Sequence, residues 1–118
     1  MTEPEAGVPT RLQHIVLLSF PDDLSTAEDA ELRAMVRSWP REIGTMSEAR
    51  IGTDLTGART RGYQYLLYTV FPDTKTLAEY VAHPVHQQLV RFLDDRRCQR
   101  LAFDYYLDET TDAFASRG

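Results

Sequence analysis

The chain has a single cysteine, Cys98, and no apolar stretch long enough to cross a membrane. One cysteine excludes an internal disulfide and is typical of a reducing compartment. A spanning helix needs about 20 apolar residues, and the first residues lack the basic and apolar regions of a secretion signal. The sequence therefore predicts a soluble, cytoplasmic protein without membrane association, in which Cys98 is a partly buried spacer.

Positive charge is also scarce. The 118 residues carry a formal net charge of -5, and Lys75 is the one lysine among the 13 basic residues. Proteins that bind nucleic acid need clustered cations, so no nucleic-acid partner is expected. An amine nucleophile would have to be Lys75 or the N-terminus, and Lys75 lies among polar neighbours that keep it solvated.

Hydrophobic residues make up 42% of the chain, which is sufficient for one buried core. Neither end of the chain shows periodicity, so we expect one domain over residues 11–107 and flexible tails at residues 1–10 and 108–118.

Four segments of the domain read as strands. Residues 12–20 and 62–71 are apolar on both faces, which is typical of central strands. Residues 47–55 have one polar face and suit an edge strand, and residues 101–107 form the last strand.

Helices are predicted between these strands. Ser25 and Glu28 have the spacing of a capping box that starts a helix. An apolar stripe follows at helical spacing until Pro40 ends this helix; it consists of Leu32, Met35, Val36 and Trp39. Asp73 caps a second helix, which breaks before Pro84 and continues through the HQQLVRFL segment.

The resulting order, βαββαβ, predicts a ferredoxin-like α+β fold with the helices on one face of a four-stranded antiparallel sheet. The other face has no cover, although the first, third and fourth strands are apolar there. An exposed apolar patch of this kind usually marks an interaction surface. We therefore expect a second copy of the chain to cover it in a homodimer.

Five segments over residues 12–107 carry a resemblance to a known family: LQHIVLLSF, IGTDLT, GYQYLLYTVF, TLAEYVAHPVH and LAFDYYL. The most specific is Tyr-x-x-His-Pro-x-His between a helix and a final Phe-Asp-Tyr strand. The sequence resembles the stress-responsive A/B-barrel domain (Dabb) proteins of the dimeric α+β-barrel superfamily. The resemblance implies a dimer of ferredoxin-like domains that form an α+β barrel around a small-molecule pocket.

The resemblance also implies a site. In cyclases of this family, a tyrosine and a histidine of the helix pair promote an intramolecular aldol condensation of a linear polyketide, and these positions match Tyr80 and His86. A pocket histidine of the first strand matches His14. The sequence departs from the pattern at Tyr65, where such cyclases have a further pocket histidine on the third strand.

Each candidate catalytic residue also has a structural interpretation. His86 can act as a general base, because imidazole titrates near neutrality, or it can be an ordinary helix-face histidine. Tyr80 can stabilise a developing enolate, or it can be a core aromatic residue.

The expected substrate-binding wall is apolar with a few hydroxyl groups, and core packing explains the same residues equally well. It consists of Val16, Tyr63, Tyr65, Leu67, Phe71, Leu89 and Phe103.

No cofactor is expected. His14, His83 and His86 invite a metal hypothesis, but carboxylate or cysteine partners are missing, and His83 is better explained as a helix cap or turn residue. Nothing in the sequence favours haem or flavin. Arg50 has Glu48 and Asp54 as near partners and is expected to be solvated.

Three functions remain compatible with these residues. The first is a cofactor-independent acid–base enzyme acting on a small carbonyl-rich, polyketide-like molecule by cyclisation, aldol-type chemistry or isomerisation. The second is a non-catalytic, stress-related binder of a hydrophobic small molecule. The third is a cofactor-free monooxygenase, in which the substrate itself activates oxygen.

Overall fold

A single antiparallel sheet forms one layer of the protein in the computed structural model, which describes residues 11–107. Its strands are β1 (Arg11–Ser19), β2 (Glu48–Thr53), β3 (Tyr65–Phe71) and β4 (Gln99–Leu107). The spatial order is β2-β3-β1-β4, so β1 and β3 are central and β2 and β4 are edges. The expected central and edge strands are confirmed; the expected tails lie outside the described residues.

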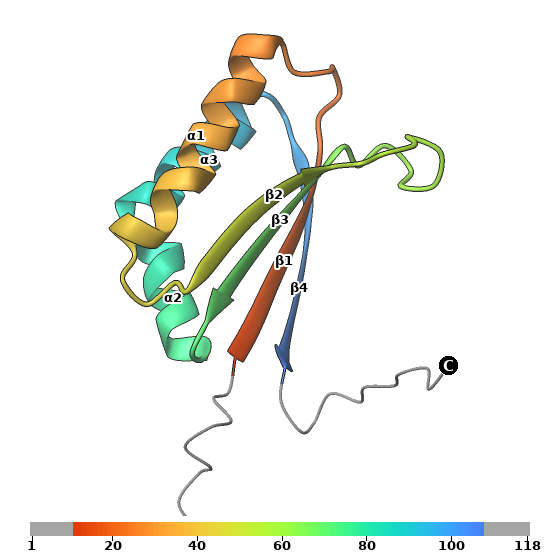
Figure 1. The fold of residues 1–118 in the computed structure, drawn as a ribbon. Helices are drawn as coiled ribbons and strands as arrows, with labels where there is room; N and C mark the ends of the chain where they lie inside the picture. The colour runs from red at the N-terminus through yellow and green to blue at the C-terminus, as the bar shows by residue number, and fades with distance from the viewer. Residues whose placement is uncertain (1–10, 108–118) are drawn as a thin grey trace, which may run out of the picture.

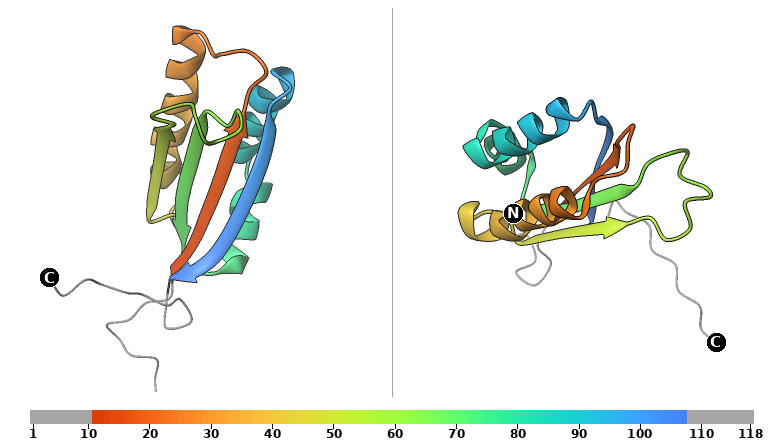
Figure 2. Two further views of the ribbon diagram at one scale, coloured as in Figure 1. Left: turned by 90° about the vertical axis from the view of Figure 1, so that its right-hand side faces the viewer. Right: turned by 90° about the horizontal axis from the view of Figure 1, so that it is seen from above.

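Three helices cover one face of this sheet, as Figures 1 and 2 show. They are α1 (Thr26–Glu42), α2 (Thr74–Ala82) and α3 (Pro84–Asp95). The ferredoxin-like order βαββαβ with a broken second helix is confirmed. No helix within residues 11–107 combines the length and the apolar character needed to cross a membrane.

Local signals fix where the first helix begins, but one of them misplaces its end. The Ser25 hydroxyl accepts from the Glu28 backbone N–H at 3.1 Å, and the Glu28 carboxylate accepts from the Ser25 N–H at 2.9 Å. The prediction that Pro40 ends this helix is wrong, because α1 continues to Glu42. A proline removes one helical hydrogen bond, and the Ile43 N–H still donates to the Trp39 carbonyl at 2.7 Å.

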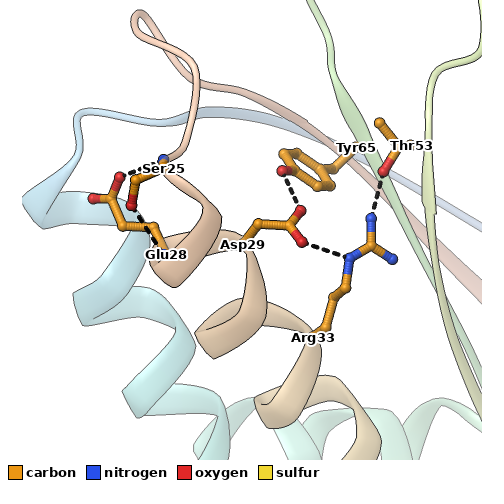
Figure 3. A network of polar contacts seen from close by, with 6 residues as sticks. All are labelled: Ser25, Glu28, Asp29, Arg33, Thr53 and Tyr65. Carbon is orange, nitrogen blue, oxygen red and sulfur yellow. Dashed lines mark hydrogen bonds and ion pairs between the residues drawn. The ribbon is translucent and has the colours of Figure 1, made fainter.

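A polar network holds α1 against the sheet (Figure 3). The Tyr65 hydroxyl of β3 donates to Asp29 of α1 at 2.6 Å. Arg33 donates from Nε to the other Asp29 oxygen at 2.9 Å and from Nη2 to the Thr53 hydroxyl of β2 at 2.6 Å. The network thus connects α1 with both strands at one end of the sheet.

Alternation along the strands separates two faces of the sheet. On β1, Leu12 and Leu18 point into the core with exposed fractions of 2% and 0%, and His14 and Val16 share their side. The opposite face lacks helices (Figure 2). Large apolar side chains stay exposed there: Leu66 by 37%, Leu101 by 54%, Phe103 by 66% and Leu107 by 39%. We call these four residues the open face.

Candidate active site

A cavity of about 180 Å³ lies between the sheet and the helices. Most of its walls are apolar, which is typical of small-molecule sites. The sheet supplies His14, Val16, Leu67, Thr69, Arg100 and Ala102, and the helices supply Trp39, Tyr80, Val81, His86, Leu89, Val90 and Leu93.

The break between α2 and α3 brings two of the predicted residues together. His83 ends α2 and caps α3, because its Nδ1 accepts from the Val85 N–H at 3.1 Å, and Pro84 occupies the first turn. The structural role expected for His83 is confirmed. Across this break the Tyr80 and His86 rings meet edge to face, with centroids 4.9 Å apart.

Tyr80 is held by aromatic neighbours. Its ring is 2% exposed and lies 5.5 Å from the Trp39 ring and 5.3 Å from the Phe71 ring, measured between centroids. Burial raises the pKa of the Tyr80 hydroxyl, because the phenolate would lose its hydration. Tyr80 therefore stays protonated and remains a hydrogen-bond donor at any physiological pH.

His86 is shifted toward its neutral form. Burial is the main factor that lowers the pKa of His86; the charges of His14 and Arg100 act in the same direction, and the Val81 carbonyl opposes them. Its Nδ1 is buried and has no hydrogen-bond partner among the described residues. A neutral imidazole in an apolar wall is the form that can accept a proton.

His14 is oriented from the neighbouring strand. Its Nδ1 donates to a carboxylate oxygen of Asp104, which faces it in the β1–β4 register. With Nδ1 donating, a neutral His14 carries its lone pair on Nε2. The arrangement is that of a histidine fixed by a carboxylate, as in many acid–base sites.

The expected wall residues divide into three groups. Val16, Leu67 and Leu89 line the cavity together with the three candidate catalytic residues. Phe71 packs against Tyr80 with its ring tilted, and it does not line the cavity.

The other three wall residues lie elsewhere. Tyr63 and Tyr65 line a second hollow of about 340 Å³ at the loop between β2 and β3. Tyr65 is also committed to Asp29, and its pKa is raised to about 12, chiefly by burial. Phe103 lies on the open face, because the strand alternation turns it away from the helices.

Sequence reasoning missed several residues of this site: Trp39, Thr69, Arg100, Ala102 and Asp104. The apolar spacing of the first helix predicts only a core position for Trp39, and the apolar residues of β4 draw attention to the face that points away from the helices. The signal available was the polar alternation of β4, with Arg100 and Asp104 two positions on either side of Ala102. Their pairing with β1 residues follows only from the strand register.

The histidines do not form a metal-binding group here. His14 and His86 line the cavity, whereas His83 is the helix cap. Within residues 11–107, His, Cys, Asp and Glu side chains do not come together in any group of three or more that could hold a metal ion.

Comparison with known proteins places this architecture. A family profile described as the stress responsive A/B barrel domain matches residues 12–107. The chain is 28% identical over 98 residues to olivetolic acid cyclase from Cannabis sativa, covering 80% of this chain and 94% of the cyclase.

Solved structures show the same fold. A hydroxynitrile lyase from Passiflora edulis superposes with a TM-score of 0.74 at 20% identity, covering 88% of this chain and 99% of the lyase. A dimeric ferredoxin-like protein of unknown function from Thermobifida fusca gives a TM-score of 0.72 at 18% identity, covering 91% and 100%.

Proposed function

Because this chain belongs to the stress responsive A/B barrel domain family, we propose that it is a cofactor-independent acid–base enzyme acting on a small, carbonyl-rich molecule. The reaction is a cyclisation or another aldol-type step. One observation carries the proposal: His14, Tyr80 and His86 come from three different elements and meet at one largely apolar cavity. Core packing alone does not require three titratable side chains at the same cavity.

The roles follow from the protonation states. Neutral His86 takes a proton from a carbon between two carbonyl groups, and the electron pair moves onto the carbonyl oxygen as an enolate. Tyr80 donates a hydrogen bond to that oxygen, where charge develops. The enolate carbon then attacks another carbonyl group further along the same molecule, and protonated His86 returns its proton to the new alkoxide. His14 supports this sequence from β1, with Asp104 fixing its ring.

The relatives support this class of chemistry in general terms. The comparisons include a cyclase and a lyase, named as such. A non-catalytic binder of a hydrophobic molecule would use the same cavity but would need neither the His86 base nor the Asp104–His14 pair. The enzyme is therefore the better-supported reading of the site.

The assembly and location follow as parts of the proposal. We infer a homodimer, because the open face carries exposed apolar side chains and related structures are described as dimeric. The β2–β3 loop projects past the sheet on the same side, with Leu55 95% exposed (Figure 1).

The buried free thiol of Cys98 fits a reducing compartment and supports a cytoplasmic location.

The proposal is tested with a linear poly-β-keto substrate, supplied both as the free carboxylic acid and as a thioester, with cyclised product followed by absorbance and mass spectrometry. His86→Ala should lower turnover by about 10²–10⁴-fold, the usual contribution of a positioned base. Tyr80→Phe keeps the ring packing and should lower kcat with a smaller effect on KM. Both variants should keep the thermal midpoint of the wild type within a few degrees.

The matched control is His83→Asn, which removes another imidazole of the same helix pair but keeps a good capping side chain. Its turnover should equal that of the wild type. Unchanged turnover in His86→Ala would move the chemistry to another group. If the wild type binds hydrophobic ligands at micromolar concentration but turns over no carbonyl-rich compound, the protein is a binder.

A further inference from the structure

Arg100 lies at one end of the cavity. On β4 it shares the helix-facing side with Ala102 and Asp104, and its partner on β1 is Leu18, whereas Asp104 faces His14. Alternate strand residues are about 7 Å apart. Arg100 and the His14–Asp104 pair are therefore separated by about 13 Å along the strand, and a ligand lying over Ala102 extends between them.

The cavity has an electrostatic preference. None of the described residues that line it is acidic, and the guanidinium of Arg100 supplies a positive charge. The neighbouring Asp104 lies outside this lining and pairs through one of its oxygens with the His14 ring. A cationic ligand would find no acidic side chain in the described lining of this cavity, whereas an anion would find a guanidinium in a largely apolar surrounding.

Arg100 also has hydrogen-bond donors that the described residues do not use. Within the described part of the chain its hydrogen bonds come from Nη2, which donates to Asp94 and, at 3.5 Å, to the Cys98 carbonyl. The Asp94 side chain is 62% exposed, so this ion pair contributes at most about 1 kcal/mol. Nε and Nη1 remain for a ligand, and the guanidinium fork matches the two oxygens of a carboxylate.

We propose that Arg100 is a specificity residue that binds a carboxylate, so that the ligands of this cavity are small carboxylic acids whose chain runs toward His14 and His86. The inference names the substrate class of the proposed enzyme and rests on that function for its reacting end. A small cavity of about 180 Å³ suits a short chain better than a bulky one.

Binding can be measured without knowing the substrate, because Trp39 lines the cavity and is the single tryptophan. The probes are hexanoate and hexanamide, which have the same chain and differ in charge. A hydrogen bond to a charged group is stronger than one to a neutral group, so wild-type protein should bind hexanoate about ten-fold more tightly by Trp39 fluorescence.

Arg100→Gln should remove this preference while changing the hexanamide affinity by no more than about two-fold. Arg100→Lys keeps the charge and should retain part of the preference. The control is Arg91→Gln, which removes a positive charge from an exposed position of α3 outside the cavity and should bind like the wild type.

Three results would overturn the inference: no binding of either probe, equal binding of both by the wild type, or an unchanged preference in Arg100→Gln. These results are distinct from failure of the proposed function. Selective hexanoate binding without turnover would support the carboxylate site and contradict the proposed enzymatic function. Normal turnover without any preference for hexanoate would support the enzymatic function and contradict the carboxylate site.

Discussion

Tyr80 and His86 show how one environment acts on two residues in opposite directions. Burial disfavours the charged form of each, so it raises the pKa of the Tyr80 hydroxyl and lowers the pKa of the His86 imidazole. Between these two values both side chains are neutral, one as a donor and the other as an acceptor. The pair therefore has a wide pH range in which its protonation states suit proton transfer from carbon.

This predicts the shape of the pH–rate profile. Activity requires neutral His86, so kcat/KM should rise with pH through the pKa of His86, which lies below the ordinary imidazole value of about 6.5. The alkaline fall should lie above the ordinary tyrosine value of about 10. The measurement is kcat/KM against pH, which reports groups of the free enzyme.

Two variants assign the limbs of this profile. Tyr80→Phe should remove the alkaline limb and leave the acid limb in place. The imidazole of His14 also faces the cavity, so His14→Gln is needed to separate its contribution from that of His86. Disappearance of the acid limb in His14→Gln, or an acid midpoint above the ordinary imidazole value, would contradict the assignment of His86 as the base.

At the scale of secondary-structure elements, the Asp29 network fixes α1 on β2 and β3. The hydrogen bond from Tyr65, followed by the bond from Arg33, lowers the pKa of the Asp29 carboxyl below its ordinary value. Arg33 is about one third exposed, which limits its contribution through solvent screening. Of the two donors to Asp29, the Tyr65 hydroxyl is the better buried, because Tyr65 is only 8% exposed.

Tyr65→Phe is therefore expected to destabilise the protein by about 1.5 kcal/mol, at the low end for a hydrogen bond to a charged group. Turnover should not change, because Tyr65 lies outside the cavity. Urea unfolding at neutral pH measures the first effect and the enzyme assay measures the second. The control is Tyr63→Phe, since no hydrogen bond to the Tyr63 hydroxyl exists within residues 11–107.

The stability difference between the wild type and Tyr65→Phe should also depend on pH. A carboxyl whose pKa is lowered by folding contributes stability above its unfolded value, and this contribution is lost as pH falls through the folded value. The difference between wild type and Tyr65→Phe should therefore shrink when the solution is acidified below about pH 4. A large loss of turnover in Tyr65→Phe would instead support its original assignment to the substrate wall.

Element type and order follow from local signals in this sequence. The Ser25–Glu28 capping box, the Asp73 cap and the position of Pro84 each act within one turn of helix, so they can be recognised without tertiary information. The helix end predicted at Pro40 is wrong, because one missing hydrogen bond near the C-terminus of a helix is tolerated when packing favours the helix.

The site is less accessible to such reasoning, because it depends on register and layer. The pairing of His14 with Asp104 joins residues 90 positions apart, and nothing local to either strand specifies it. Alternation on β4 separates Phe103 from Asp104 correctly, but hydrophobicity does not say which side meets the helices. The family resemblance supplied Tyr80, His86 and His14, whereas Arg100 and Asp104 needed the structure.

At the scale of the whole molecule, the two faces of one sheet have different uses. On β1 and β4, His14 and Asp104 face the cavity, while their neighbours Ile15 and Phe103 pair on the opposite side. A sheet covered by helices on one side leaves its other apolar side in water, which is costly at about 25 cal/mol per Å². A second copy of the chain offers a complementary surface of the same character.

Phe103→Asp tests this arrangement. A stable interface buries about 800 Å² on each partner, and Phe103 is the most exposed of the large apolar side chains on the open face. An unpaired carboxylate at this position would be desolvated in the dimer, so the variant should be monomeric at micromolar concentrations. Light scattering after size exclusion should give the wild type twice the 13.5 kDa chain mass and the variant the single mass.

Gln88→Asp adds the same charge at an exposed position of α3, on the helical layer, and should remain dimeric. A wild-type protein that is monomeric with native circular dichroism, or a Phe103→Asp variant that stays dimeric, would show that the open face is not the interface.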